Sequence, residues 1–445
     1  MVDIEVIPVG GYNEFGRNMT VVRVGREAVV FDMGIKLDRI LIHEDAVFES
    51  LSPQDLWDLG AIPDDRILSD LGAKVVAIVL GHGHLDHIGA VRKLAGKYNC
   101  PIYATPYTAR LVEETVTQQG RREIPNKIVP MNAGQRRPLT SQLELEFVHM
   151  THSIVQTALP VLHTPKGAIV YALDYKLDNS PVIGNRPDYE RLRQLGMEGV
   201  HAVILESTNA DQETKSMSET IARDMLRDYL FGMESDRLGI TVTTFSSHTA
   251  RIKSIMEFGV EMGREVILLG RSMEKYTQAA EETGLLKIPE GVHIQGYGRQ
   301  VDHALKRVMR EGKENFLLVV TGHQGEPNAL LSRMASRDTP YKLDSDDMVI
   351  FSARTIPNPV NVANRYVLET KLRMHGAHII KGAHVTGHAM REDHRQFLSM
   401  LSPEHILPAH GEITYQSALA DLAEYQGWKL NSNIHILRNG ESLEL

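Results

Sequence analysis

A short histidine-rich loop constrains the fold of this 445-residue chain more than any other segment. It reads His82-Gly83-His84-Leu85-Asp86-His87 and follows Val75–Leu80, an apolar run rich in β-branched residues. Such a run predicts a strand that is buried on both faces of a parallel sheet. Imidazole nitrogens and carboxylate oxygens on a loop leaving a rigid strand suit zinc, with manganese as the alternative. The sequence therefore predicts an α/β fold with a metal site at a strand end.

Three further candidate ligands follow other predicted strands, namely His152, Asp174 and His410. The carboxyl end of a strand is where functional residues of α/β sheets gather. Each residue by itself has an ordinary explanation: a loop histidine, a helix cap or a turn residue. Their combination with the central loop favours the interpretation as ligands.

The pattern of the chain changes at about Ser216. Before it, short predicted strands are separated by glycine turns; after it, predicted helices and strands alternate. The alternating segments are Ser218–Phe231 (helix), Ile240–Thr244 (strand), Ala250–Met262 (helix), Glu265–Leu269 (strand), Phe316–Thr321 (strand) and Met348–Phe351 (strand). This rhythm is typical of a doubly wound parallel sheet. Together with the length, it predicts two α/β units.

Composition restricts the class of protein. The net charge of −9 and the pI of about 6.1 argue against a general nucleic-acid coat protein, but they allow an enzyme with one local groove for nucleic acid. Cys100 is the only cysteine, so no intramolecular disulfide can form and a reducing compartment is favoured. No secretory signal is evident at Met1, and no apolar run is long enough for a bilayer. We expect a cytoplasmic protein with no membrane partner.

The candidate ligands and their spacing resemble those of the metallo-β-lactamase superfamily. The resemblance implies an α/β fold, an αββα sandwich with two divalent metal ions, zinc or alternatively manganese, between its sheets. It assigns His82, His84 and His152 to one metal ion, assigns Asp86, His87 and His410 to the other, and makes Asp174 the bridge. A water between two cations is then the nucleophile of a hydrolysis.

Three further features resemble the β-CASP nucleases. They are Glu206 at a predicted strand end, His388 in Thr386-Gly387-His388-Ala389, and His410 in a Pro-x-His-Gly-Glu setting. The resemblance implies a β-CASP domain, residues 209–382, inserted between two parts of the lactamase domain, residues 1–208 and 383–445. It makes Asp86, Glu206 and His388 catalytic: Glu206 supports a ligating histidine, and His388 contacts the scissile phosphate. Taken singly, Glu206 is a surface carboxylate and His388 a loop histidine.

Within the β-CASP nucleases, the chain is most similar to the ribonuclease J family, in its short archaeal form. The resemblance rests on Gly10–Met19, Glu206-Ser207-Thr208-Asn209, Thr321–Pro327, Phe351–Pro357 and His384–Ala389. It implies a 5′→3′ exoribonuclease for single-stranded 5′-monophosphorylated RNA, with endonucleolytic cleavage as a second mode, in RNA decay and processing. A homodimer and other RNA-decay proteins are the partners that it suggests. With 35 residues after His410, we expect the extra C-terminal domain of bacterial members to be absent.

Two glycine-containing loops between predicted strands and helices are candidate phosphate sites, because backbone N–H groups and a helix start favour an anion. The residues that we expect to contact RNA are Gly322, His323, Gln324, Gly325, Glu326, Ser352, Arg354, His384 and His388. An ordinary strand-to-helix turn is the alternative for each loop. Arg121-Arg122 and Arg136-Arg137 are candidate backbone contacts, with a solvated surface as the alternative.

Three rival functions share this metal chemistry or this fold. An ester or thioester hydrolase has no need of the inserted segment 209–382. A non-catalytic RNA-binding subunit would lack ligands, whereas all the expected positions are filled here. A β-CASP endoribonuclease of the cleavage and polyadenylation type is the nearest alternative, although archaeal forms often begin with KH domains.

Overall fold

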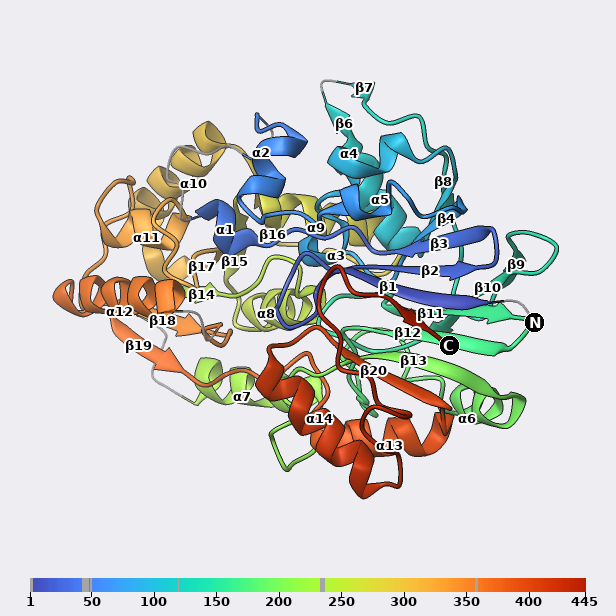
Figure 1. The fold of residues 1–445 in the computed structure, drawn as a ribbon. Coiled ribbons are helices and arrows are strands. Elements are labelled where there is room, and N and C mark those ends of the chain that lie inside the picture. The colour runs from blue at the N-terminus through green and yellow to red at the C-terminus, as the bar shows by residue number, and fades with distance from the viewer. Residues whose placement is uncertain (1–2, 42–47, 49, 119, 233–236, 357–358) are drawn as a thin grey trace. The chain divides into compact units, whose positions relative to one another are not determined.

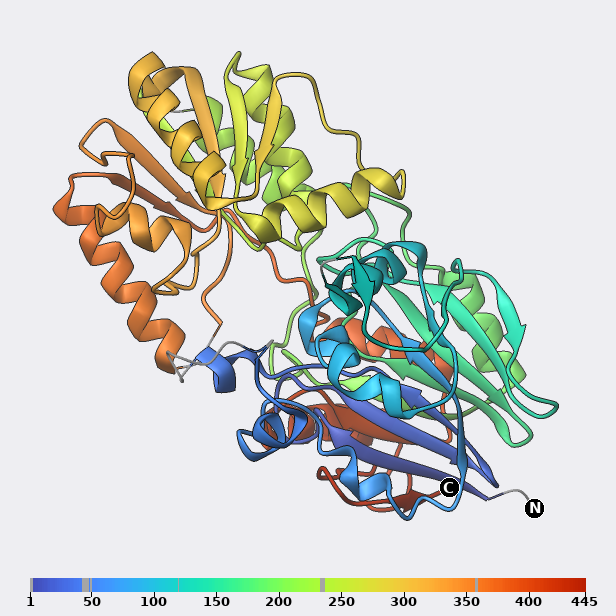
Figure 2. The same ribbon diagram turned by 90° about the horizontal axis from the view of Figure 1, so that it is seen from above.

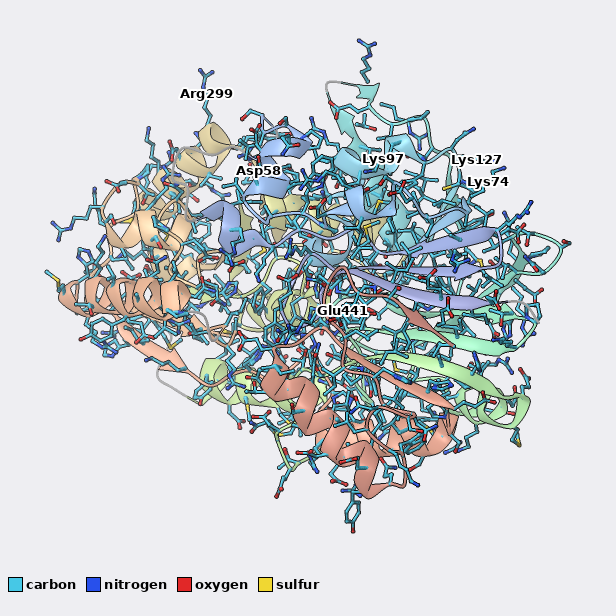
Figure 3. The ribbon with its side chains drawn as sticks, in the orientation of Figure 1. Asp58, Lys74, Lys97, Lys127, Arg299 and Glu441 are labelled. Atoms are coloured by element: carbon cyan, nitrogen blue, oxygen red, sulfur yellow. The ribbon has the colours of Figure 1, made fainter. Side chains whose placement is uncertain are left out.

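The strand before the histidine loop is β4 (Lys74–Leu80), an inner strand of a seven-stranded sheet. Lys74 marks its outer end in Figure 3, so the loop that begins near His82 leaves from the opposite, carboxyl end. The strand order is β21 (Leu443–Glu444), β1 (Ile4–Gly10), β2 (Met19–Val24), β3 (Glu27–Phe31), β4, β5 (Ile102–Ala104) and β8 (Ile128–Pro130). β3, β4, β5 and β8 are parallel, as their continuous apolar runs require.

A second sheet has six strands. Their order is β20 (His405–Ala409), β13 (Val200–Glu206), β12 (Gly167–Ala172), β11 (Ala158–Thr164), β10 (Glu144–His149) and β9 (Arg136–Pro138). β12, β13 and β20 run parallel to one another, which brings their carboxyl ends to one edge. The segments after Ala172, Glu206 and Ala409 therefore emerge side by side.

The two sheets pack face to face. Buried side chains such as Phe31, Phe147, Tyr171 and Leu407 fill the space between them. The outer face of the second sheet packs against α6 (Tyr189–Glu198), α13 (Arg391–Leu401) and α14 (Ile413–Tyr425). On the first sheet, α5 (Pro106–Val116) packs against β5 and β8. Figure 1 shows these layers, which confirm the predicted αββα sandwich.

A third sheet belongs to a separate unit. All six of its strands are parallel: β16 (Val292–Gln295), β15 (Glu265–Leu269), β17 (Phe316–Val320), β14 (Gly239–Thr243), β18 (Asp347–Phe351) and β19 (His378–Lys381). One face packs against α10 (Gly298–Glu311), α11 (Leu330–Ala335) and α12 (Pro359–Met374). On the other face, Val266 and Leu317 meet Gly259 of α8 (Thr249–Glu261). Helices on both faces (Figure 2) make this the doubly wound unit that the alternating pattern predicts.

The structure is a computed structural model that describes residues 3–41, 48, 50–118, 120–232, 237–356 and 359–445. They divide into one unit of residues 1–177, 186–216 and 387–445 and another of residues 178–185 and 217–386. The sequence-based domain limits, 208/209 and 382/383, stay a prediction. Within the described ranges, no helix combines the length and the apolar character needed to cross a bilayer.

The segment Leu85–Lys97 is helical, but it is not one continuous helix. It consists of α3 (Leu85–Ile88), α4 (Val91–Leu94) and a 3₁₀ turn at Ala95–Lys97. The break follows from a neighbouring segment, because Met33 N donates to His87 O, Asn18 N donates to Asp86 O and Ala90 N donates to Met33 O. These backbone groups are bound to another segment and are not available for the hydrogen bonds of a continuous helix.

Candidate metal centre

The seven predicted ligands all lie at the carboxyl ends of strands in the lactamase-like unit. The loop after β4 supplies four of them, and the segments after β10, β12 and β20 supply His152, Asp174 and His410. Asp174 and His410 have positive φ angles of 56° and 46°, a conformation that costs energy in residues other than glycine. Such strain at the carboxyl ends of two strands of one sheet is typical of a functional site.

One group of side chains consists of His82, His84, His152 and Asp174, whose donor atoms lie within 4.8 Å of one another. His84 Nδ1 lies 3.1 Å from His82 Nε2 and 3.2 Å from His152 Nε2. Asp174 Oδ2 lies 3.3 Å from His82 Nε2. Three imidazole nitrogens and a carboxylate oxygen converging on one point are the donor set of a zinc site.

The second group consists of Asp86, His87 and His410. Asp174 also reaches this group, because its Oδ1 lies 3.2 Å from His410 Nε2 and its Oδ2 lies 3.3 Å from His87 Nε2. Among the described residues, the buried Asp174 Oδ1 has no hydrogen-bond partner. A buried carboxylate oxygen without a donor, placed between two histidine groups, fits a cation.

Hydrogen bonds on the far side of the rings orient three of the histidines. His87 Nδ1 donates to Asp32 Oδ2 at 2.6 Å, and His410 Nδ1 donates to Asn18 Oδ1 at 2.8 Å. His152 Nδ1 donates to the carbonyl of Gly387 at 2.6 Å. Each bond uses the Nδ1–H, so Nε2 is the ring nitrogen that lies toward the centre.

Asp32 and Asn18 were not among the residues expected from the sequence. Asp32 directly follows β3, and a position at a strand end is the same signal that pointed to Asp174. Asn18 lies in the Gly10–Met19 motif, where no spacing rule distinguishes it from its neighbours. Only the packed structure brings it to His410, 392 positions later in the chain.

The electrostatics of the centre favour the metal-binding protonation state at His82, His152 and Asp174 but not at His87. Burial would lower the pKa of His87, but Asp174, Asp32 and Asp86 outweigh burial and raise that pKa well above its usual value. Burial, assisted by repulsion from His87, lowers the pKa of His82 to about 3. Burial also holds the pKa of His152 well below its usual value. Burial would raise the pKa of Asp174, but His410, His87 and His388 outweigh it and hold that pKa well below the usual range. Two neutral imidazoles and an ionised carboxylate are the forms that coordinate a cation.

Glu206 hydrogen-bonds to His388 and to none of the five candidate histidine ligands. Its Oε2 accepts from His388 Nδ1 at 2.7 Å, and its Oε1 accepts from Tyr175 N at 2.7 Å. The sequence-based expectation was that Glu206 would support a ligating histidine. Burial alone would lower the pKa of His388, but the carboxylates of Glu206 and Asp174 raise it to about 9. The ring of His388 lies 4.9 Å from that of His152 and 6.0 Å from that of His410, beside both groups.

The candidate RNA-binding residues His323 and Ser352 are buried in the other unit. His323 is 4% exposed, its ring packs against Phe245, and burial lowers its pKa to about 3. The Ser352 hydroxyl donates to the carbonyl of Ala383 and accepts from Arg251. The only hydrogen that the Ser352 side chain can donate is therefore already in a hydrogen bond. In this conformation, neither the His323 nor the Ser352 side chain is accessible to a ligand from solvent.

Gln324 connects the two candidate loops of this unit. Its Nε2 donates to Arg354 O at 3.0 Å, and its Oε1 accepts from Ile356 N at 2.9 Å. Glu326 supports the same turn by accepting from Gln324 N. Gly325, at φ 81°, lies so close to the backbone of Asn364 that a Cβ would be 2.3 Å from its carbonyl carbon. The paired loops leave Arg354 exposed.

The other residues that the sequence suggested as RNA contacts are distributed over both units. Gly322 turns the first loop at φ 109°, and Pro357 lies outside the described residues. His384 is half-buried in the same unit. In the other unit, Arg136 is paired with Glu146, and Arg122 donates to Asn126 O.

Comparison with known proteins agrees with this geometry. Three family models match: the metallo-β-lactamase superfamily at residues 12–177, the ribonuclease J β-CASP domain at residues 237–369, and the Zn-dependent metallo-hydrolase RNA specificity domain at residues 374–433. Ribonuclease J of Methanocaldococcus jannaschii is 49% identical, with 99% of this chain and 98% of that protein covered. Ribonuclease J of Pyrococcus abyssi is also 49% identical, with 99% and 97% covered.

A solved structure of a protein of unknown function from Enterococcus faecalis superposes with a TM-score of 0.65 and covers 100% of both chains. At 16% identity it supports the fold alone. The fold and the site define a metal-binding hydrolase of the metallo-β-lactamase superfamily with a β-CASP domain. Within that class, the chain belongs to the ribonuclease J family.

Proposed function

We propose that this chain is a two-metal ribonuclease that degrades single-stranded, 5′-monophosphorylated RNA from its 5′ end in the cytoplasm. The observation that carries the proposal is the position of Asp174. Its two oxygens lie 3.2 Å from His410 Nε2 and 3.3 Å from His82 Nε2, so one carboxylate contacts both groups of donors. Zinc suits these donors, and manganese is the alternative.

The seven side chains His82, His84, His152, Asp174, Asp86, His87 and His410 would hold the two cations. Two divalent cations held there would supply a water of lowered pKa and would offset the charge that develops on the phosphoryl oxygens. Hydrolysis adds the water oxygen to phosphorus and breaks the bond from phosphorus to O3′. The products are a 5′ phosphate and a 3′ hydroxyl.

His388 is the candidate proton donor to the departing O3′. With a pKa of about 9 in the metal-free chain, its ring is protonated at neutral pH. Glu206 holds Nδ1, so Nε2 is the nitrogen that would face the substrate. A positioned acid of this kind contributes about 10²–10⁴-fold to a rate.

Recognition of the 5′ end is assigned to the β-CASP domain, proposed as residues 209–382. Its paired loops carry the exposed Arg354, whose guanidinium can bind phosphate. Gly322 and Gly325 are buried and Gly325 N donates to Gly322 O, so these glycines shape the turn that supports Arg354. Membership in the ribonuclease J family supports the 5′→3′ direction. The same membership suggests a homodimer and partners in RNA decay.

The decisive experiment digests one single-stranded RNA bearing a 5′ monophosphate, a 5′ hydroxyl or a 5′ triphosphate, with Zn²⁺ or Mn²⁺. Each RNA carries either a 5′ or a 3′ label. We expect immediate release of mononucleotide from the 5′ label, fastest with the monophosphate. Internal fragments that do not depend on the 5′ end would indicate the β-CASP endoribonuclease alternative. Absence of cleavage with either metal would contradict the proposal and direct attention to ester and thioester substrates.

A further inference from the structure

A second cluster of histidines lies at the amino ends of β13 and β20, opposite to the strand ends that carry the candidate metal centre. His201 is near the start of β13, Glu404 precedes β20, and His405 begins it. Because the strands pair with Ala202 opposite His405, the cluster is at their amino ends. Glu206 and His410 are at the carboxyl ends, about 16 Å away at roughly 3.3 Å per residue. The cluster is therefore separate from the candidate metal centre.

The three side chains of this cluster are close enough to share one cation. Each offers a donor atom within 4.8 Å of the others. His201 Nδ1 lies 2.7 Å from Glu404 Oε2, and the rings of His201 and His405 are 5.5 Å apart. His201 is 7% exposed, and within the described part of the chain its buried Nε2 has no hydrogen-bond partner. A buried imidazole nitrogen without a partner needs a structural reason, and a ligand is one.

His435 supports the cluster from a third segment. Its Nε2 lies 3.0 Å from His405 Nδ1, a contact that orients the His405 ring and leaves Nε2 as the coordinating nitrogen. Burial, with repulsion from His201, lowers the pKa of His405. Burial, with repulsion from His405, lowers the pKa of His435. Both shifts favour neutral imidazole, the form that binds metal, at His405 and His435.

One positive charge opposes a cation here. Lys166 is near enough to His405 to lower its pKa further, but its ammonium group donates to the carbonyl of Leu445. Glu404 supplies the compensating negative charge, and its side chain is 66% exposed, so it can adjust to a ligand. The charges therefore permit a divalent cation.

We propose that His201, Glu404 and His405 form an additional divalent-cation site that selects Zn²⁺. Two imidazoles and one carboxylate, completed by water, match tetrahedral zinc and lack the oxygen ligands that Mg²⁺ and Ca²⁺ require. A cation there ties β13 to β20, the strands whose other ends carry Glu206 and His410. Its effect is to stabilise that strand pair, with no part in the reaction.

The first test measures metal content. The full chain is stripped with a chelator, reloaded with Zn²⁺, desalted and assayed for zinc per chain by elemental mass spectrometry. The variants are Glu404→Gln and His405→Gln, with His378→Gln, an exposed histidine of the other unit, as control. We expect the two site variants to hold one zinc fewer than the parent and the control. Equal zinc content in all four proteins would overturn the proposal.

A second measurement does not depend on stoichiometry. Glutamine at position 404 can still accept the hydrogen bond from His201, so a purely structural role would survive the Glu404→Gln change. We expect added Zn²⁺ to raise the melting temperature of the parent by more than that of Glu404→Gln. We also expect titration against a competing chelator to show that Glu404→Gln binds zinc at this site at least tenfold more weakly than the parent. The same Zn²⁺-dependent shift in both proteins would refute a metal site. Cleavage of RNA by Glu404→Gln at the parent rate keeps this result separate from the proposed ribonuclease function.

Discussion

The Nδ1–H of His388 donates to Oε2 of Glu206 across 2.7 Å, although the two residues are 182 positions apart. The other oxygen of Glu206 is held by Tyr175 N, so the carboxylate has little freedom to rotate. Glu206 is fully buried, whereas the side chain of His388 is 26% exposed. The pair therefore presents an oriented imidazole beside the candidate metal centre, and the carboxylates of Glu206 and Asp174 favour its protonated form.

Loss of the His388 imidazole should slow the chemical step without weakening RNA binding greatly. We expect His388→Ala to lower the single-turnover cleavage rate about 10²–10⁴-fold, because the proton donor is removed. Glu206→Gln should cost less, about 10–100-fold, because the ring remains but is held less firmly. The exposed carboxylate variant Glu213→Gln is the control. Cleavage by His388→Ala at the parent rate would remove this residue from the mechanism.

Asn18 should influence metal affinity although it is not itself a ligand. Its Oδ1 accepts from His410, and its Nδ2 lies 3.1 Å from His87 Nε2. We expect Asn18→Ala to weaken binding at the Asp86–His87–His410 group by about 10–100-fold, with activity largely restored by excess metal. Zinc competition titration checks this, with the exposed Asn99→Ala as control. Unchanged affinity would mean that the histidines hold their orientation without this hydrogen bond.

Arg354 should contribute to phosphate binding. We expect Arg354→Ala to weaken binding of 5′-monophosphorylated RNA about tenfold and to reduce the slope of log affinity against log salt by about one unit. The preference for a monophosphate over a hydroxyl end should fall as well. Arg299 of α10, which projects outward in Figure 3, is the matched arginine control in the same unit. Equal losses of RNA affinity in Arg354→Ala and Arg299→Ala would indicate only a general effect of removing a positive charge.

Acid stability should depend on Glu146. Burial opposes its ionisation, but hydrogen bonds from His163 and Arg191 outweigh burial and lower its pKa to about 2. Because the folded pKa lies below the unfolded value of about 4.3, this group stabilises the fold above that value and the contribution disappears as the pH falls towards 2. We expect Glu146→Gln to cost about 2 kcal/mol at pH 7, after allowance for solvent screening, and almost nothing near pH 2.

Denaturant unfolding of the parent and Glu146→Gln at several pH values measures this difference. Glu144→Gln, at a more exposed carboxylate on the same strand, is the control, and its effect should be small at every pH. A destabilisation of Glu146→Gln that does not change with pH would point to lost packing and not to the ion pairs.

Local sequence was sufficient to predict those features of the fold and of the site that depend on residues close together in the chain. The continuous apolar run at Val75–Leu80 predicts a buried parallel strand, and β4 occupies Lys74–Leu80. Ser218 caps the helix that begins at Glu219, as its position before an amphipathic run indicates. The histidine loop supplies four candidate ligands within six positions, so their proximity follows from covalent geometry. The αββα fold and the ribonuclease J family followed from these signals and the ordered motifs.

Tertiary structure decided the relationships between distant segments. The sequence did not indicate that Glu206 binds His388, that Asp32 and Asn18 orient His87 and His410, or that His201 meets His405. It also could not distinguish the exposed Arg354 from the buried His323 and Ser352. The reason is physical: periodicity specifies which face of an element is apolar, whereas these contacts depend on strand register, sheet order and the packing of side chains between layers.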